Sequence, residues 1–434
     1  MRKRFQALVE ETRQWELPQG RRNMMKRFLA ATGLISLCLA SVASAENISM
    51  WVRSGIGDSF KKVVEAYNTG HDDKVTLTEV PFSELVQKYA TSIAGGQAPD
   101  ALSMDLIYTP AFAAAGQLED LTDWAKSLPY FNSLSPSHVK LGTYDGHIYG
   151  LPLSVETSVF AWNKDLYKKA GLDPEKAPAT WEEIERNAEK IRALGGDTYG
   201  FYFSGGGCGG CMIFTFTPLV WGAGADILSA DGKKATLDTP QMRKAVDIYR
   251  GMVKKDLVPA GAASDTGANF LSISNGKIGQ QSIGAFSIGT LVTQYPDIHF
   301  GVTLIPGVDN KPSSFAGGDN FVISKGTKKL DAVKKFLEYT YSLEGQKIMA
   351  KYGSLPTRGD IADQVLQGLD PRMQVGLKAI SVAKTPYTLQ FNDLINSANG
   401  PWAGFTNAAI FGSDVDGAFS NAQSEMQSII DNAQ

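Results

Sequence analysis

The carboxylate of Glu156 lies within a stretch of apolar residues, where it needs a binding partner. Glu156 interrupts the apolar stretch 151–162, L-P-L-S-V-E-T-S-V-F-A-W, whose composition predicts a buried strand. A carboxylate is costly to bury unless it is ion-paired, hydrogen-bonded or bound to a ligand. Glu156 is therefore the first candidate for ligand contact, and an internal ion pair is the alternative.

Two cysteines form the next chemical candidate. Cys208 and Cys211 lie in the sequence S-G-G-G-C-G-G-C at residues 204–211. A pair this close, in an oxidising compartment, favours a disulfide that staples the glycine-rich loop. The alternative is a C-x-x-C redox site, which needs a thiolate stabilised at a helix N-terminus.

Catalytic patterns are weak. The segment A-F-S-I-G at 285–289 loosely resembles a nucleophile elbow with Ala as its first residue, but only His299 follows it as a potential base. The four histidines show no metal-ligand spacing. Glu156 with Asp105 or Asp319 is the remaining enzyme alternative, as a glycosidase carboxylate pair. We expect a protein that is not an enzyme and has no cofactor or metal.

The first 45 residues are expected to be removed. Met25-Lys26-Arg27 is followed by an apolar run at 28–40 and by Ala43-Ser44-Ala45, which together predict a cleavable signal peptide behind a short upstream extension. Removal takes away 8 basic and 3 acidic residues and leaves 34 basic and 42 acidic side chains, a net charge of −8. The sequence thus predicts a periplasmic protein and argues against nucleic acid as a partner.

Strands and helices alternate after the signal peptide, which predicts an α/β fold with a parallel sheet. The strands are expected at 47–53, 74–80 and 101–104, and the second helix is expected to be capped by Ser83. Polar and aromatic residues near the ends of these strands are candidates for ligand contact: Trp51, Arg53, Phe82, Glu84, Asp105 and Tyr108. The alternatives are core packing for Trp51, a surface charge for Arg53 and helix caps for Glu84 and Asp105.

The second half of the chain predicts another α/β unit and a helical tail. A hairpin is expected at Asp145-Gly146, and Thr180 with Glu183 predicts a helix capping box. The remaining expected elements are a strand at 199–203, helices at 213–221 and 240–255, strands at 278–283 and 299–304 around a helix from Ser287, a long strand at 313–324, and helices from 328 onward.

Ordered sequence segments then point to a family. They are G-G-Q-A-P-D-A at 95–101, F-A-A-A-G-Q-L-E-D-L at 112–121, the tract 148–172 that contains Glu156, A-T-W-E-E-I at 179–184, S-N-G-K-I-G at 274–279, F-A-G-G-D-N-F-V-I-S-K-G-T-K-K at 315–329 and G-S-L-P-T-R at 353–358. In order and spacing the chain resembles the extracellular solute-binding proteins of ABC importers, in the family that includes the maltose-binding protein.

The resemblance implies a two-lobed periplasmic binding protein fold of type II, with a ligand cleft between the lobes and a helical C-terminal tail. Mapped on this chain, one lobe would be 46–154 plus 316–355 and the other 156–314 plus 356–434. A monomer of this kind closes around a solute and delivers it to the membrane permease subunits of an ABC importer.

The resemblance also implies further site residues. Glu156 would lie at the first crossing between the lobes, Gly318 and Asp319 after the second, and Phe286 and Trp402 at positions where relatives carry stacking aromatic residues. Aromatic candidates favour a neutral mono- or oligosaccharide; glycerol-phosphate derivatives, polyamines and peptides are the alternatives. The glycine-cysteine loop departs from the family pattern and leaves ligand size open.

Overall fold

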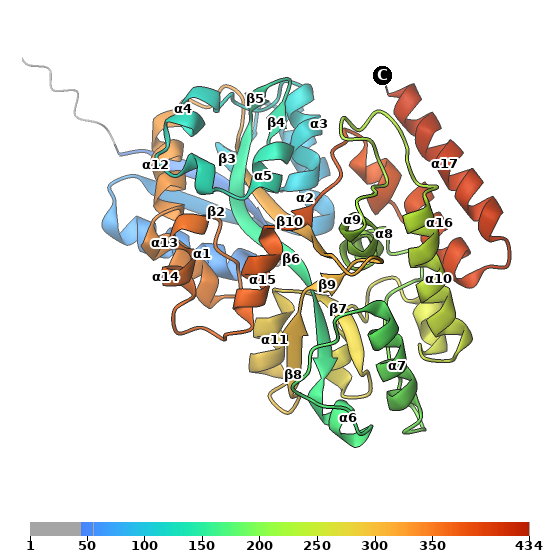
Figure 1. The fold of residues 1–434 in the computed structure, drawn as a ribbon. Helices are drawn as coiled ribbons and strands as arrows, with labels where there is room; N and C mark the ends of the chain where they lie inside the picture. The colour runs from blue at the N-terminus through green and yellow to red at the C-terminus, as the bar shows by residue number, and fades with distance from the viewer. Residues whose placement is uncertain (1–44, 55, 434) are drawn as a thin grey trace, which may run out of the picture. The chain divides into compact units, whose positions relative to one another are not determined.

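The computed structural model describes residues 45–54 and 56–433 (Figure 1). The predicted signal peptide, apart from its last residue, lies outside these described residues. None of the helices in the described part of the chain is both long and apolar enough to cross a membrane.

The N-terminal strands form the parallel sheet that the alternation predicts. β1 (Asn47–Arg53) lies between β2 (Lys74–Val80) and β3 (Ala101–Asp105) and pairs with both in parallel. The crossovers are α1 (Gly57–Gly70) and α2 (Phe82–Ala94). The predicted cap of α2 is wrong, because the helix begins one residue before Ser83 and Pro81 occupies the N-cap position.

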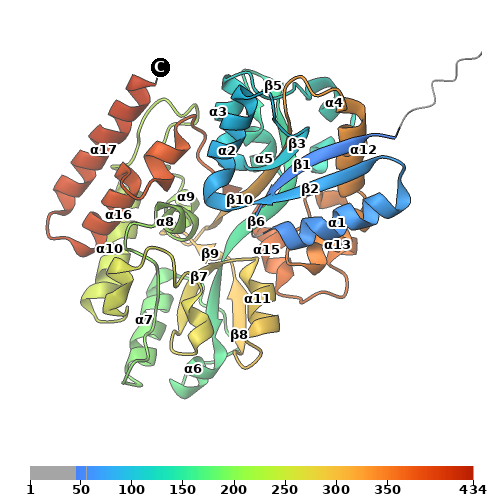
Figure 2. The same ribbon diagram turned by 180° about the vertical axis from the view of Figure 1, so that it is seen from behind.

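Two long antiparallel strands connect the halves of the unit Glu46–Gln434. They are β6 (Gly150–Asn163) and β10 (Pro312–Ile323), and the sheet order is β2-β1-β3-β10-β6-β7. The first half of β6 pairs with β10, and its second half pairs with β7 (Gln280–Gly284) and β8 (Phe300–Thr303). In Figures 1 and 2, β6 runs between a group of elements containing β1–β3 and a group containing β7 and β8. This arrangement confirms the predicted α/β, two-lobed fold class.

The crossing of β6 and β10 is held by local features of both strands. The register shifts between Asp319 and Asn320. Gly318 precedes this shift with a φ of +109°, and a Cβ there would collide with the carbonyl of Ser154. Only glycine adopts such a backbone without strain. Ser158 and Ser314 add side-chain hydrogen bonds to the ladder, of which Ser158 N to Ser314 Oγ is 2.9 Å.

Separate apolar clusters lie on the two sides of the crossing. One packs α1 and α12 (Leu330–Thr340) against β1 and contains Phe60, Phe321 and Phe336. Another surrounds Trp181, Phe201 and Trp402 and includes the C-terminal helices α16 (Pro401–Phe411) and α17 (Val415–Asn432). Burial of such large apolar side chains provides the main stabilisation of each half.

The other helices largely follow the predicted order. They are α3 (Thr109–Ala114), α4 (Thr122–Ser127), α5 (Pro136–Leu141), α6 (Lys164–Lys169), α7 (Trp181–Arg192), α8 (Gly209–Thr215), α9 (Pro218–Gly222), α10 (Pro240–Lys254), α11 (Ser287–Gln294), α13 (Leu343–Lys351), α14 (Ala362–Leu366) and α15 (Met373–Ile380). Thr180 Oγ1 caps α7 as predicted, whereas Glu183 bonds the N–H of Ala179 and so closes the capping box one residue early. The expected hairpin joins β4 (Thr143–Tyr144) to β5 (His147–Ile148).

Two local predictions are wrong. The segment 199–203 makes only isolated bridges to 278 and 281, because its amides bond alternately to Lys277, Leu257 and Gln280 and no continuous ladder forms. The helix expected at 213–221 is split into α8 and α9, because Pro218 has no N–H to continue the first helix.

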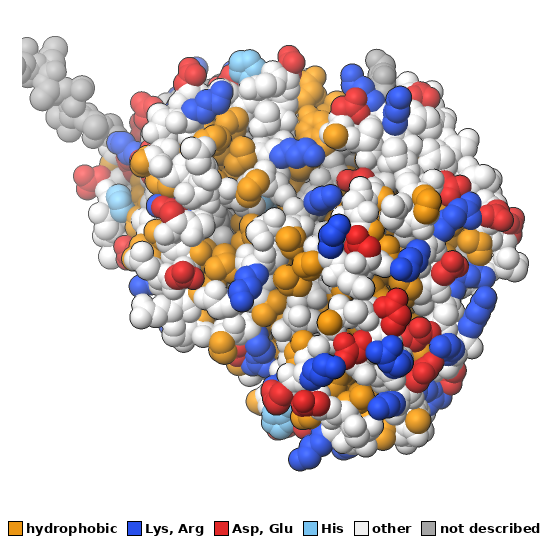
Figure 3. Space-filling model, in the orientation of Figure 1, with side chains coloured by type: hydrophobic (Ala, Val, Ile, Leu, Met, Phe, Trp, Pro, Cys, Tyr) orange, Lys and Arg blue, Asp and Glu red, His pale blue; other side chains and the backbone are white. Residues whose placement is uncertain are grey.

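The surface carries charges of both signs. On the face shown in Figure 3, Lys and Arg side chains are interspersed with Asp and Glu. This face therefore presents no broad area of one charge.

Candidate ligand-binding site

Four neighbouring strands each bring one charged residue to the same place. Arg53 ends β1, Asp105 ends β3, and Glu156 and Asp319 lie within β6 and β10. The strand registers pair Asp319 with Asp105, and place Glu156 opposite Gly317, two residues before Asp319. The sequence predicts all four as ligand-binding residues, and the sheet brings them together, but Asp319 is fully buried and is absent from the lining of the cavity described below.

Arg53 links the carboxylates of this cluster. Its Nε donates to both oxygens of Asp319, at 2.7 and 2.9 Å, and its terminal nitrogen donates to Glu156 Oε1 at 3.1 Å. The Asp319 side chain is fully buried and also accepts from Ser103 Oγ at 2.5 Å. Glu156 keeps 22% of its side chain exposed, so it is the open end of the cluster. The position of Glu156 is compatible with both ligand contact and an internal ion pair, since Glu156 is paired with Arg53 and also reaches the cavity described below.

Burial and mutual repulsion shift the proton affinities of this cluster. Burial, with the neighbouring charge of Asp319, raises the pKa of the Asp105 carboxyl to about 7, against the opposing effect of Arg53. Burial likewise raises the pKa of Glu156. For Arg53, burial lowers the pKa, but the carboxylates of Asp319, Glu156 and Asp105 outweigh it, and the pKa lies above its ordinary value. Asp105 also accepts from the N–H of Ile107, at 3.3 Å, and so fills the capping role considered as its alternative.

The cluster opens into a cavity of about 850 Å³. Arg53, Asp105 and Glu156 line it, together with residues of α2 and α3 from one half of the unit and of α8 and the C-terminal tail from the other. Amide side chains of Gln87, Asn392 and Asn396 are also in the lining. The size and mixture of apolar and polar groups are those of a small-molecule site.

Aromatic side chains form much of the cavity wall. They are Tyr108, Phe112, Phe214, Phe315 and Phe391. Phe315 is supported from behind by Trp221, whose ring lies 6.1 Å away in a stacked arrangement, and it contacts Phe214 at 5.1 Å. Of these residues only Tyr108 is predicted from the sequence. Its hydroxyl reaches Asn392 Oδ1 at 3.4 Å, across 284 residues of chain.

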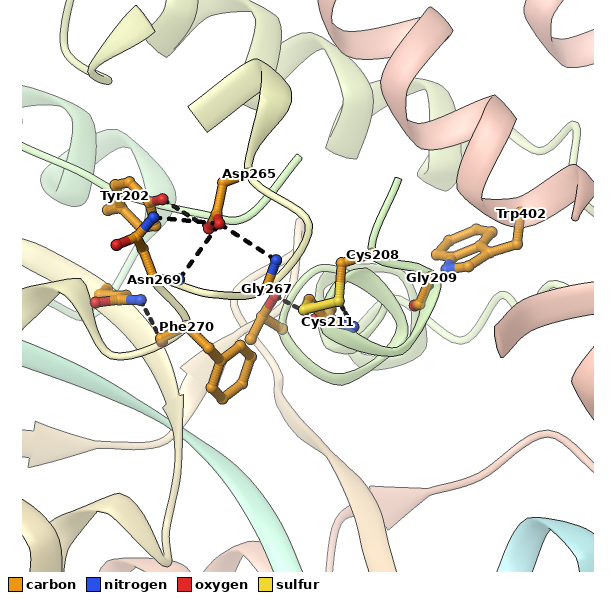
Figure 4. Close-up of a disulfide and its surroundings, with 11 residues drawn as sticks. Tyr202, Cys208, Gly209, Cys211, Asp265, Gly267, Asn269, Phe270 and Trp402 are labelled. Atoms are coloured by element: carbon orange, nitrogen blue, oxygen red, sulfur yellow. Dashed lines mark hydrogen bonds between the residues drawn. A yellow bond between two sulfur atoms is a disulfide. The ribbon is translucent and has the colours of Figure 1, made fainter. Parts of the chain in front are cut away.

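The glycine-cysteine loop forms another part of the wall. Cys208 and Cys211 are joined by a disulfide, which confirms the structural reading of this pair. Gly207, Cys208, Gly209 and Gly210 line the cavity. Figure 4 shows the disulfide beside Gly267, with Trp402 next to Gly209.

Several sequence candidates lie away from the cavity lining. Trp51 is partly buried among apolar residues, with Lys88 Nζ 5.0 Å from its ring centroid, and Glu84 is exposed on α2. Phe286 is 39% exposed and contacts Phe214. Gly318, by contrast, lines the cavity as expected of a site residue. The Phe82 side chain is outside the described part of the structure.

Trp402 requires a correction. The residue is completely buried, and its indole Nε1 donates to the carbonyl of Gly209 at 3.1 Å. No face of the ring is open to a ligand, so its place is in the core behind the glycine-cysteine loop.

Of the enzyme alternatives, the segment resembling a nucleophile elbow has no catalytic geometry, whereas Glu156 and Asp105 of the carboxylate pair both line the cavity. Ser287, in the segment resembling a nucleophile elbow, is buried at the start of α11, while His299 pairs with Asp165 at 2.9 Å. Asp319, in the carboxylate-pair alternative, is saturated by Arg53 and Ser103. Among the described residues no cluster of three or more His, Cys, Asp or Glu side chains is arranged to hold a metal ion.

Comparison with known proteins identifies the class. The family model of the bacterial extracellular solute-binding protein matches residues 53–347, and the chain belongs to this family. The family model describes solute-binding proteins, so the class that the comparison shows is a binding protein.

Individual relatives bind different solutes. The chain is 24% identical to the diacetylchitobiose binding protein DasA of Streptomyces coelicolor, over 77% of this chain and 83% of that protein. It is 26% identical to the sn-glycerol-3-phosphate-binding periplasmic protein UgpB of Yersinia enterocolitica, over 73% and 75%. The fold is similar to that of the cyclic alpha-maltosyl-1,6-maltose binding protein from Arthrobacter globiformis, with a TM-score of 0.78, 23% identity and coverage of 89% of this chain and all of that chain.

Proposed function

We propose that the protein captures a neutral mono- or oligosaccharide in the periplasm and delivers it to the permease of an ABC importer. The observation that carries this proposal is the cavity wall, in which aromatic faces stand beside a cluster of carboxylates and amides. Aromatic faces stack on the apolar patches of sugar rings, and the planar polar groups hydrogen-bond to sugar hydroxyls. DasA, a relative named for a disaccharide, supports this ligand class.

The charges of the site disfavour a phosphate ligand, although UgpB is also a relative. Among the described residues that line the cavity, Arg53 is the one cationic side chain, and its Nε and one terminal nitrogen are bonded to Asp319 and Glu156. A phosphate would face the carboxylates of Asp105 and Glu156 without a compensating lysine or arginine. A neutral polyol faces no such repulsion.

The two strands that cross between the halves supply the hinge in this proposal. One lobe is taken as 46–154 plus 316–355 and the other as 156–314 plus 356–434, and they close around the sugar by bending near Glu156 and Gly317. Because cavity residues come from both sides of the crossing, ligand contacts with both lobes would stabilise the closed state. The closed state is then the form that docks on the permease.

A ligand panel tests the proposal. The purified protein is titrated with maltose, mannobiose, N,N′-diacetylchitobiose and tagatose, and separately with sn-glycerol 3-phosphate and spermidine. At least one sugar is expected to raise the melting temperature in a concentration-dependent way and to give saturable heat in calorimetry, because a ligand that binds only the native state stabilises it by mass action.

The same panel separates the alternatives. A shift with sn-glycerol 3-phosphate or with spermidine, and none with the sugars, would overturn the carbohydrate assignment while leaving the family membership intact. Release of reducing ends from maltose or diacetylchitobiose during incubation would instead indicate a glycosidase.

A further inference from the structure

We infer that the Cys208–Cys211 disulfide is an affinity determinant of the ligand site, because it fixes the shape of the glycine wall that a sugar contacts. This inference rests on the proposed function and adds a specific group to it. The disulfide is part of the site itself, since Cys208 and the glycines on both sides of it line the cavity.

The loop has glycines where neighbouring backbone leaves no room for a side chain. A Cβ on Gly206 would collide with the backbone of Ser264, and one on Gly209 with the carbonyl of Ile395. The loop is therefore pressed against two other segments of the chain and presents bare backbone to the cavity. Such backbone is also the most flexible when it is not fixed.

One neighbouring segment packs directly against the sulfur atoms. Gly267 has a φ of +108°, and a Cβ there would lie 3.0 Å from Cys211 Sγ and 3.2 Å from Cys208 Sγ. The buried carboxylate of Asp265 organises this segment, since it accepts from Tyr202 Oη at 2.8 Å and from the Gly267 and Asn269 amides at 3.3 Å (Figure 4). The disulfide thus occupies a fitted position against an ordered turn.

The other side of the loop is fixed by the core. Trp402 Nε1 donates to Gly209 O, and the Cys211 amide donates to Cys208 Sγ at 3.1 Å, which makes Cys208 the N-cap of α8. α8 continues to Phe214, one of the aromatic residues of the cavity. The disulfide consequently positions both the glycine wall and the start of the helix that carries a stacking candidate.

Reduction removes this constraint. With dithiothreitol as the reductant, the S–S bond gains two electrons and two protons and gives two thiols, while dithiothreitol becomes its cyclic disulfide. The freed loop then has to be ordered again when ligand binds, and this conformational cost lowers affinity. The large apolar cluster behind the loop remains, so the fold is expected to persist.

The test compares oxidised and reduced protein. Calorimetric titration with the four sugars of the panel is expected to give a Kd at least about tenfold weaker after dithiothreitol. The Cys208→Ser/Cys211→Ser variant should bind with the weaker Kd whether or not dithiothreitol is present. Because this variant lacks both cysteines of the disulfide, any change that dithiothreitol causes in its Kd would have to come from another effect of the reductant.

A matched glycine pair tests the fit between the disulfide and its neighbour. Gly267→Ala is expected to weaken binding, because the new methyl group meets the sulfur atoms. Gly224→Ala is the control, because Gly224 also has a positive φ, +82°, but has nothing within 4 Å of the added Cβ, so this variant should bind like the wild type.

Hydrogen exchange gives a readout that needs no ligand. Peptides from 204–215 should exchange faster after reduction, while those of β1 and β6 stay unchanged. Equal Kd values for oxidised and reduced protein, or unaltered exchange at 204–215, would overturn the inference. If no sugar binds the oxidised protein, the proposed function fails, and the exchange comparison still decides whether the disulfide orders the wall.

Discussion

The two sides of the cavity are built in different ways. The charged side comes from β1, β3, β6 and β10, four adjacent strands that each place one ionisable residue in register. The aromatic and glycine side comes from α3 and Tyr108 just before it, from the glycine-cysteine loop and α8, from Phe315 on β10 and from segments of the C-terminal tail. Strand ladders fix the first side, whereas side-chain packing and one disulfide fix the second.

We call the charged side of the cavity its floor and the aromatic and glycine side its wall. This difference implies that the floor is rigid and that the wall can adjust. Backbone hydrogen bonds between strands set the positions of Arg53 and Asp319 regardless of ligand, and their ion pair is buried. The loop at 205–210 has no such ladder. We therefore expect substitutions on the charged side to change mainly the stability of the protein, and substitutions on the other side to change mainly its affinity for ligand.

The largest effect is expected for Arg53→Met. Removing the guanidinium leaves the fully buried Asp319 carboxylate without its partner, and loss of one member of a buried ion pair costs about 3–5 kcal/mol in the free energy of unfolding. Urea denaturation measures this loss. Lys62→Met is the control, because Lys62 and Glu65 form an exposed pair, with 47% and 50% of their side chains accessible, and its removal should leave the midpoint unchanged. Equal midpoints for Arg53→Met and wild type would show that the floor is not held by this ion pair.

The difference between the two sides of the cavity also explains which site residues could be predicted from the sequence. Arg53, Asp105 and Glu156 are found because strand periodicity and strand ends are visible in the sequence, and a charge within an apolar run is conspicuous. Asp319 is found only through the family resemblance, which places it after the second crossing. Phe214, Phe315 and Phe391 look like ordinary core residues, since only tertiary packing turns their faces to the cavity. Phe315 did carry a signal, because it begins the family-like segment 315–329 and lies shortly before Gly318, which the resemblance places after the second crossing.

Trp402 shows the opposite error. Its resemblance to a stacking position gives the right neighbourhood, because the residue contacts the loop that lines the cavity. The direction of the indole depends on packing against residues such as Phe216 and Phe405, which no local pattern encodes.

The next effect concerns the floor at low pH. His138 is fully buried; its Nε2 donates to the carbonyl of Ser154 on β6, and its Nδ1 accepts from Ser135 Oγ, both at 2.9 Å. Burial lowers its pKa to about 4, against about 6.5 in the unfolded chain. As the pH falls, His138 is therefore protonated in the unfolded state before it is protonated in the native state. The native protein is fully stabilised by this group above pH 6.5 and loses on the order of 3 kcal/mol of its free energy of unfolding as the pH falls toward 4.

His138→Gln isolates this contribution. The difference in the free energy of unfolding between wild type and variant should shrink from pH 7 to pH 4.5, as measured by urea denaturation at each pH. Asp105 acts in the opposite sense, because its pKa of about 7 makes the native state the better proton acceptor and its penalty disappears as the pH falls. A constant difference across this range would mean that His138 is not the group responsible.

A smaller effect is expected on the wall. Phe214→Leu removes an aromatic face from the cavity, and the Kd for a binding sugar should rise about five- to tenfold. Phe286→Leu is the matched control, because Phe286 contacts Phe214 but is absent from the cavity lining. Calorimetric titration measures both variants. An equal rise in the Kd for Phe286→Leu would show that Phe286 also stacks on the ligand, as the sequence predicts, and that the binding surface extends to this residue.

The smallest effect tests the point where floor and wall meet. Glu156→Gln keeps the shape of the side chain and an acceptor oxygen but removes the charge that faces Arg53 at 3.1 Å. Because Arg53 keeps its two hydrogen bonds to Asp319, the melting temperature should change little, while the Kd for a sugar should rise about threefold through weaker charge-assisted hydrogen bonding. Unchanged affinity would show that Glu156 is an internal ion-pair residue and does not contact the ligand. A large loss of stability without loss of affinity would show that Glu156 helps to hold β6 in place.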